Sequence, residues 1–162
     1  MSMRVGIGYD VHAFAEASTG RSLVVGGVQI PYERGLAGHS DADVLLHAIV
    51  DALLGAAALG DIGLHFPSSD ARWRDTPSTA FLTATRTLLG AQGWGVGNLD
   101  ATIVAERPQL APYVAAMRAH LAEALGIPLE RISVKSKTTD GLGFAGRGEG
   151  IAAYAVALIT QG

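Results

Sequence analysis

The chain has 162 residues, a formal net charge of −3 at neutral pH, and a composition of 49% hydrophobic and 17% charged residues. This length fits a single domain over residues 1–162 with room for a sizeable core, and the apolar content argues against disorder. Lys and Arg never cluster, which argues against nucleic acid as a partner. The sequence has no cysteine, so a metal site would have to use histidines and carboxylates.

The hydropathy of the chain gives no sign of a membrane segment. No apolar run reaches the roughly 18 residues of a membrane-spanning helix, and the N-terminus has no signal-peptide core. We therefore expect a cytoplasmic enzyme or binding protein that does not contact a membrane.

The chain opens with two segments of strand character. Residues 4–12 predict a strand that ends in polar residues, and the alternation of strand side chains places Asp10 and His12 on one face. Residues 23–31 predict a strand or a hairpin, interrupted by Gly26-Gly27. The first strand therefore presents an imidazole and a carboxylate side by side.

A helix is expected next, over residues 40–58, with Ser40 or Asp41 as its N-cap. Its apolar positions cover more than one stripe, which predicts burial on most sides. His47 lies within this apolar surface, and a polar group there needs a partner. Two carboxylates one helical turn away could hydrogen-bond its imidazole: Asp43 and Asp51.

The remainder alternates helices and strands. Residues 59–75 form an irregular stretch whose length is typical of a functional or mobile loop. After it we expect a helix over 77–92 capped by Thr76, a strand over 99–105, a helix over 108–125 ended by Gly126, a strand over 132–136, a glycine-rich loop over 141–150 and a strand over 151–159.

This order predicts one sheet with helices packed on a face, an α/β two-layer sandwich. The strand over 151–159 is apolar at nearly every position, so both of its faces should be covered. Three helices are few for both sides of a sheet. Self-association through the uncovered face is therefore expected.

One set of residues has the composition of a metal site. Asp10, His12 and His47 offer one carboxylate and two imidazoles, which suit Zn²⁺ and leave a fourth tetrahedral position open. Two alternatives stay open at this point. The Asp-x-His pair could lie in a surface turn, and the helical histidine could be a hydrogen-bonded core residue.

Three further segments have functional and ordinary interpretations. His39 and Ser40 at a helix N-terminus could bind an anion such as phosphate, or could serve only in plain N-capping of the helix. Asp61 between glycines could accept from sugar hydroxyls, or lie in a solvated turn. Residues 137–140 (KTTD) could hold phosphates and a hard cation such as Mg²⁺.

The glycine-rich loop over 141–150 fits neither standard phosphate-binding fingerprint. It lacks the Gly-Lys-Ser/Thr ending, and no helix is expected after it. Within it, Arg147 and Glu149 could form an anion site, but a surface ion pair is the better interpretation.

Taken together, these segments resemble the 2-C-methyl-D-erythritol 2,4-cyclodiphosphate synthases along essentially the whole chain. The resemblance rests on many ordered matches rather than on one motif. The matching segments are residues 8–12 (GYDVH), 26–31 (GGVQIP), 39–41 (HSD), 46–48 (LHA), 51–63 (DALLGAAALGDIG), 66–67 (FP), 142–144 (LGF) and 146–152 (GRGEGIA).

The resemblance implies a fold and a reaction. The fold would be α+β, a four-stranded mixed sheet covered by helices on one face, assembled as a homotrimer with active sites between subunits. The reaction would convert 4-diphosphocytidyl-2-C-methyl-D-erythritol 2-phosphate into 2-C-methyl-D-erythritol 2,4-cyclodiphosphate and CMP, with the 2-phosphate attacking the β-phosphorus. Two other functions are weighed beside it: a trimeric isoprenoid-diphosphate-binding protein without turnover, and a zinc phosphohydrolase.

The resemblance also implies residue roles. Asp10, His12 and His47 would bind Zn²⁺, His39 and Thr138 would be catalytic, and Asp140 would bind Mg²⁺ or Mn²⁺ with the substrate diphosphate. Phe144 and Arg147 would line a central cavity of the trimer, where some members hold an isoprenoid diphosphate. The substrate-binding set would be Asp10, Val11, His12, His39, Ser40, Asp61, Ile62, Gly63, Phe66, Pro67, Ser68, Ser69, Asp70, Ala105, Glu106, Arg107, Pro108, Gln109, Leu110, Ala111, Lys137, Thr138, Thr139, Asp140, Phe144 and Arg147.

Three places depart from the family pattern. Ser136-Lys137 replaces a small residue and a Thr, and adds a charge near the phosphates. Asp140 stands where Glu is common, so its carboxylate is one methylene shorter. Ser68 stands where Asp is usual after Phe-Pro. The zinc set itself is complete, which favours a working enzyme over a binding protein.

Overall fold

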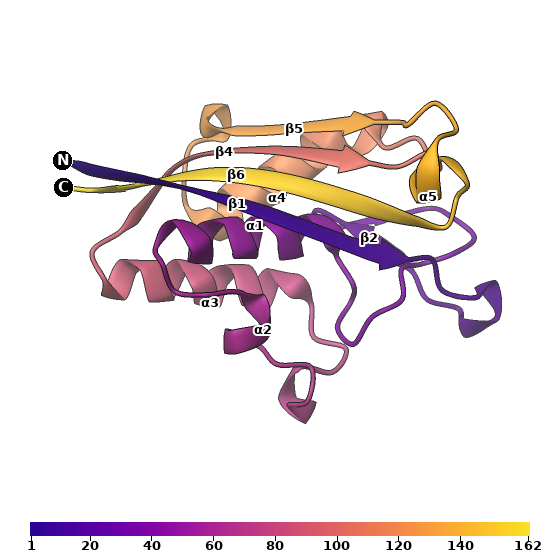
Figure 1. Cartoon of the computed structure of the whole chain (residues 1–162), viewed down its shortest axis with the longest axis horizontal. Coiled ribbons are helices and arrows are strands. Elements are labelled where there is room, and N and C mark those ends of the chain that lie inside the picture. Colours follow the sequence, from indigo (N-terminus) through magenta and orange to yellow (C-terminus); the bar gives the residue numbers. More distant parts are fainter.

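A mixed four-stranded sheet forms one layer of the molecule (Figure 1), as seen in a computed structural model that describes residues 1–162. Its strand order is β1-β6-β4-β5, with antiparallel β1–β6 and β6–β4 pairs and a parallel β4–β5 pair. A separate hairpin pairs β2 with β3. The strands are β1 (Ser2–Ala13), β2 (Leu23–Val25), β3 (Val28–Ile30), β4 (Gly95–Val104), β5 (Ile132–Lys137) and β6 (Gly150–Gln161).

The three long helices lie on one face of this sheet, and α5 lies at the strand ends, which confirms the expected α+β sandwich (Figure 1). The three long helices are α1 (Val44–Ala56), α3 (Ser78–Ala91) and α4 (Val114–Leu125), and the two short ones are α2 (Ile62–His65) and α5 (Gly143–Gly146). Four 3₁₀ turns span Ala17–Thr19, Ala71–Trp73, Ala111–Tyr113 and Leu129–Arg131. No helix combines the length and the apolar character that crossing a membrane requires.

Helix α1 begins four residues later than expected, at Val44, and its N-cap is Asp43 instead of Ser40 or Asp41. The reason is the backbone of Ala42, whose φ of 57° is left-handed and cannot continue a right-handed helix. The Asp43 carboxylate accepts from the backbone N–H of Leu46 and so satisfies a donor of the first turn.

Other helix boundaries also differ from those expected from the sequence. The expected helix over 108–125 is regular only from Val114, because Pro112 lies in a 3₁₀ turn that precedes it. Helix α3 is capped by Pro77 instead of Thr76. The irregular stretch over 59–75 contains α2 and the turn Ala71–Trp73, and the glycine-rich loop contains α5.

Helix α1 packs unusually close to β1 because the strand presents glycines to it. A Cβ added to Gly8 would lie 1.8 Å from the carbonyl oxygen of Ala48, and one added to Gly6 would lie 2.0 Å from that of Ala52. Residues two and four positions after Gly8 on this face are Asp10 and His12. The glycines therefore let the helix bring His47 against these two strand residues.

The opposite face of the sheet is bare in the single chain. The three long helices all lie on the other side, so one chain covers only one face of residues 151–159, and the expected self-association through the uncovered face stays a prediction. Tyr154 and Val156 of β6 are exposed, and their neighbours on β1 expose a further apolar row, with Ile7 72% exposed. This row consists of Val5, Ile7, Tyr9 and Val11.

Candidate metal centre and adjoining clefts

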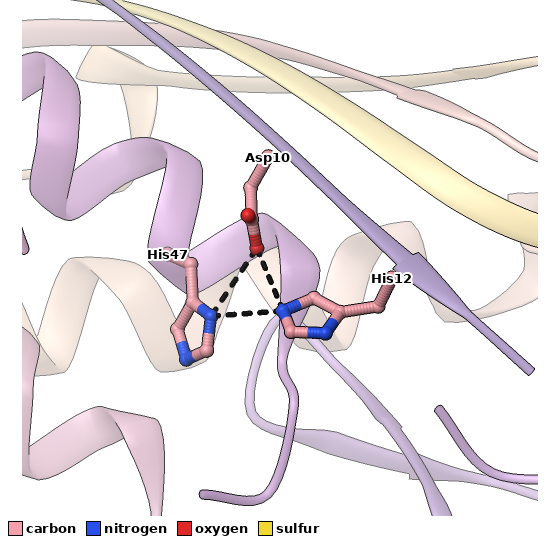
Figure 2. A group of neighbouring side chains, drawn as sticks. All are labelled: Asp10, His12 and His47. Atoms are coloured by element: carbon pink, nitrogen blue, oxygen red, sulfur yellow. Dashed lines mark hydrogen bonds and ion pairs between the residues drawn. The ribbon is translucent and has the colours of Figure 1, made fainter. Parts of the chain in front are cut away.

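Three side chains from two elements meet at the end of β1 (Figure 2). Asp10 and His12 come from the strand, and His47 comes from α1. Asp10 Oδ2 lies 2.9 Å from His12 Nε2 and 3.2 Å from His47 Nδ1, and the two imidazole nitrogens are 3.2 Å apart. Two ligands bound at about 2.0–2.1 Å to a tetrahedral zinc ion are about 3.3–3.4 Å apart. The triangle therefore fits one face of a zinc tetrahedron after a slight expansion.

Each imidazole also forms a hydrogen bond at its other nitrogen, the one that points away from Asp10. His12 Nδ1 lies 2.7 Å from the carbonyl oxygen of Ala37, to which only an N–H can be directed. His47 Nε2 lies 2.8 Å from Ser78 Oγ and 3.2 Å from Ser40 Oγ. Partners of this kind fix the ring orientation of metal-binding histidines. These contacts exclude the surface-turn alternative for the strand pair.

The contacts within the triangle favour an ionised Asp10 and a protonated His12. Burial by itself would raise the pKa of Asp10, but hydrogen bonds and charge from His12 and His47 outweigh it and lower that pKa to about 2. Burial likewise opposes the protonated form of His12, yet the hydrogen bond and charge of Asp10 raise its pKa overall. The site is thus a fixed carboxylate that attracts a cation, either protons or a metal ion.

The two helical carboxylates expected to hydrogen-bond His47 do not do so. The oxygens of Asp43 accept from the backbone N–H groups of Gly26, Gly27 and Leu46, so this buried carboxylate ties the β2–β3 turn to α1. Asp51 Oδ1 instead accepts from the N–H of Ile62. Helical spacing had suggested that these carboxylates accept from the His47 imidazole, but both accept from backbone N–H groups instead.

A cleft of about 230 Å³ opens beside the triangle. His39 and Ser40 line it, but they lie five and four residues before the first residue of α1, and Asp43 is the N-cap. The expected contribution of the α1 N-terminus to an anion site is therefore wrong. His39 Nε2 is buried in the structure and has no hydrogen-bond partner. The cleft is lined by His12, His39, Ser40, His47, Ile62, Gly63, Phe66, Ser68, Trp73 and Phe81.

A second cleft, of about 480 Å³, lies at the ends of β4 and β5. It is lined by residues 105–111 and 136–138, and all of these except Ser136 belong to the expected substrate-binding set. The two clefts share one end of the sheet, since Val11, Ala152, Val104 and Lys137 form a single row across β1, β6, β4 and β5. At about 4.8 Å per strand, the ends of that row are about 14 Å apart.

The remaining expected site residues lie around these clefts rather than inside them. Asp61 caps α2 through Leu64 N–H, Asp70 pairs with Arg72, and Pro67 and Ser69 flank Ser68 in the same loop. Val11 exposes its side chain on the bare face. Thr139 Oγ1 donates to the carbonyl of Leu142, and Asp140 Oδ1 accepts from Thr138 Oγ1 at 3.3 Å.

The glycine-rich loop carries the expected surface ion pair. Arg147 Nη2 lies 3.2 Å from Glu149 Oε2, and both side chains are more than half exposed. Phe144 is partly exposed on the neighbouring α5. Neither residue lines the two clefts.

Several functional neighbours could not be found from the sequence. Ser78 contacts His47 although 31 residues separate them, and Asp41 accepts from the hydroxyl and the N–H of Ser78. Trp73 and Phe81 form a cleft wall with Phe66, whose ring is stacked on Phe81. No local pattern marks these partners, because each depends on how α3 packs against α1.

Comparisons with known proteins agree with this geometry. The model of the YgbB family matches residues 3–160. The chain is 59% identical over 160 residues to the 2-C-methyl-D-erythritol 2,4-cyclodiphosphate synthase of Thiobacillus denitrificans, covering 99% of this chain and 98% of the relative. It is 60% identical over 159 residues to the synthase of Geobacter metallireducens, covering 98% of this chain and 99% of the relative.

Solved structures show the same fold. The bifunctional IspDF of Campylobacter jejuni matches with a TM-score of 0.94 and 38% identity, over 99% of this chain and 43% of that one. IspF of Plasmodium falciparum, solved as a CDP complex, matches with a TM-score of 0.85 and 32% identity, over 99% of this chain and 97% of that one. The similarity in sequence and fold covers nearly the full chain, and the candidate metal ligands are all present. The chain belongs to the YgbB family, that of the 2-C-methyl-D-erythritol 2,4-cyclodiphosphate synthases.

Proposed function

We propose that this protein converts 4-diphosphocytidyl-2-C-methyl-D-erythritol 2-phosphate into 2-C-methyl-D-erythritol 2,4-cyclodiphosphate and CMP. An oxygen of the 2-phosphate attacks the β-phosphorus, the bond between that phosphorus and the oxygen of CMP breaks, and CMP leaves with the electron pair. No protein nucleophile is consumed. The observation that carries the proposal is the open triangle of Asp10, His12 and His47 beside a cleft, in a chain whose relatives are synthases of this name.

The triangle is the proposed Zn²⁺ site. The donor set of one carboxylate and two imidazoles is one that zinc prefers, and three protein ligands leave a position for a substrate oxygen. When bound, the ion would supply positive charge that stabilises a phosphate oxygen. The protein's own part is to hold the three donors in place through Ala37 and Ser78 and to direct the open position into the cleft.

Two groups on the cleft wall are proposed to bind phosphate. His39 Nε2 is buried and lacks a partner, and a substrate oxygen would satisfy it. Ser40 Oγ accepts from the N–H of Ala42, so its hydroxyl proton is available to a phosphate. Donors fixed in advance stabilise the charge of a transferring phosphoryl group at little reorganisation cost.

The second cleft is the proposed nucleotide side. Lys137 and Thr138 lie on its wall and would contact the diphosphate, with Thr138 as the second catalytic residue. Asp140 is two residues further on and would hold Mg²⁺ or Mn²⁺ with the diphosphate, since carboxylate oxygens suit hard cations. Residues 61–70 are proposed to contact the methylerythritol part, because Ile62, Gly63 and Ser68 reach the first cleft.

We also propose a homotrimer whose active sites lie between subunits. On the bare sheet face, β1 and β6 expose an apolar surface that one chain leaves in water. Within one chain the two clefts are at opposite edges of the sheet, about 14 Å apart along the shared row. Assembly over the bare face would bring the β1 edge of one copy toward the β5 edge of another, and Phe144 and Arg147 toward a shared axis that could hold an isoprenoid diphosphate.

The test is ³¹P NMR of the cytidine substrate incubated with protein, Zn²⁺ and Mg²⁺. The proposal expects a cyclic diphosphate and an equal amount of CMP. CMP with a linear diphosphate would mean that water attacks, as in a phosphohydrolase. Bound zinc without turnover would indicate a binding protein that catalyses no reaction. His47→Ala should lose both zinc and turnover, whereas His120→Ala, a histidine that bonds Thr79 away from the clefts, should keep both.

A further inference from the structure

A chain of hydrogen bonds continues outward from the metal triangle through Ser78 to Asp41, a residue that has no role in the function proposed above. Ser78 is fully buried at the first position of α3, and its Oγ lies 2.8 Å from His47 Nε2. The same hydroxyl contacts Asp41 Oδ1, and the N–H of Ser78 donates to Asp41 Oδ2 at 2.9 Å. The carboxylate is therefore held by two donors of one residue.

The direction of these bonds follows from the number of protons. An ionised carboxylate only accepts, so the single proton of the Ser78 hydroxyl goes to Asp41. Toward the imidazole the serine can then present only a lone pair. His47 Nε2 must carry a proton to use it, and Ser40 Oγ, at 3.2 Å, is placed to share that proton.

The tautomer decides whether His47 can bind a metal. A neutral imidazole has one N–H and one lone pair, so a proton on Nε2 leaves the lone pair on Nδ1. Nδ1 is the atom that faces Asp10 Oδ2 and His12 Nε2 in the triangle. Second-sphere partners of metal-bound histidines orient the ring and make it a stronger donor.

We propose that Asp41 and Ser78 are positioning residues for the metal site, which lock His47 in the tautomer and orientation that direct Nδ1 at the ion. This inference rests on the proposed zinc site and extends it to α3. Ser78 is the first residue of α3, and Asp41 lies in the segment just before α1. The pair therefore also joins the start of α3 to the start of α1, the helix that carries His47.

Two variants test the pair in different ways. Ser78→Ala removes the group that accepts from His47. Asp41→Asn places an amide where the carboxylate was, and an N–H directed at Ser78 Oγ would turn the serine proton toward His47 Nε2. The matched control is Thr85→Val, because Thr85 is also fully buried in α3 but bonds only the carbonyl of Phe81.

The first measurement is the Zn²⁺ dissociation constant by chelator competition, on the full chain, with folding checked by circular dichroism. Ser78→Ala and Asp41→Asn should each weaken zinc binding about 10–100-fold, and Thr85→Val should keep the wild-type value. The second is the ¹H resonance of His47 Nε2–H in the zinc-loaded protein. It should be slow to exchange with water in wild type and in Thr85→Val, and should shift upfield and broaden in Ser78→Ala.

The outcomes distinguish a failure of the positioning role of Asp41 and Ser78 from a failure of the metal site. Wild-type zinc affinity in both variants, or an unchanged Nε2–H resonance in Ser78→Ala, would overturn the positioning role even if the variants unfold at lower temperature. If Ser78→Ala does not fold, Asp41→Asn decides by the same two readouts. A wild-type protein that binds no zinc would overturn the metal site itself, which is a different failure.

Discussion

The distance between β1 and α1 sets the geometry of the metal triangle, and Gly8 is the residue that tests this. Its missing Cβ lets the carbonyl of Ala48 approach, one position after the ligand His47. In Gly8→Ala, the new methyl carbon would start 1.8 Å from that oxygen and would have to recede to at least 3.4 Å for ordinary contact. Both partners are backbone atoms of regular elements, so the strand and the helix must separate.

That displacement is large compared with what a metal site tolerates. Metal–ligand distances hold to within about 0.2 Å, so moving His47 away from Asp10 and His12 would leave at most two donors in reach of one ion. We expect Gly8→Ala to weaken zinc binding at least about tenfold, the range seen when the support of a ligand is lost. Overpacking should also lower the free energy of unfolding by about 1–3 kcal/mol or more.

The matched control is Gly55→Ala, another glycine of the same β1–α1 contact region. A Cβ there would meet the carbonyl of Ile7 at 3.9 Å, which is ordinary contact. Replacing a helical glycine by alanine should stabilise the protein by about 0.5–1 kcal/mol and leave zinc binding unchanged. The assays are zinc competition and urea unfolding of both variants. Equal zinc affinity in Gly8→Ala and Gly55→Ala would refute the view that close approach sets the triangle.

Three further predictions follow from other contacts. Asp43→Ala should lower the free energy of unfolding by about 3–5 kcal/mol in urea, because it removes the helix cap and leaves N–H groups of Gly26 and Gly27 unpaired. Asp70→Ala, which removes the cap of a single 3₁₀ turn at a partly exposed residue, should change it far less. Because Asp10 raises the pKa of His12 above 6.5, zinc must displace that proton. Apparent zinc affinity should therefore still rise with pH above 6.5, and a plateau already below it would contradict the shift. Ile7→Lys on the bare face should reduce the mass measured by light scattering to that of one chain, whereas Leu129→Lys, at another exposed apolar residue outside this face, should not.

The sequence predicted those features that depend on neighbours along the chain. Asp10 and His12 share a face because strand side chains alternate, and the structure confirms it. The hairpin at Gly26-Gly27 is also confirmed, since both residues take the positive φ that its two-residue turn requires. The apolar surface around His47 correctly predicted a helix buried on most sides.

Features that depend on packing between distant elements were missed or misplaced. The start of α1 was expected at residue 40, because nothing local shows that Ala42 is left-handed. Asp43 was expected beside His47, yet its oxygens face the turn at Gly26 and Gly27, which only the folded chain brings there. The contact between Ser78 and His47 has no counterpart in any periodicity.

At the metal site, the identity of the ligands depends on local sequence, whereas their geometry depends on packing between distant elements. Ligand chemistry depends on residue type, so a strand Asp-x-His and a helical His could be named from sequence as candidate metal ligands. Ligand geometry is fixed by contacts with residues that never touch the ion: Gly8 sets the depth of α1, Asp43 anchors its first turn, and Ser78 orients the His47 ring. A substitution at any of these three could disable a chain whose ligands are all intact. The completeness of a ligand set is therefore necessary for metal binding in this fold, but it is sufficient only when these supporting contacts are present as well.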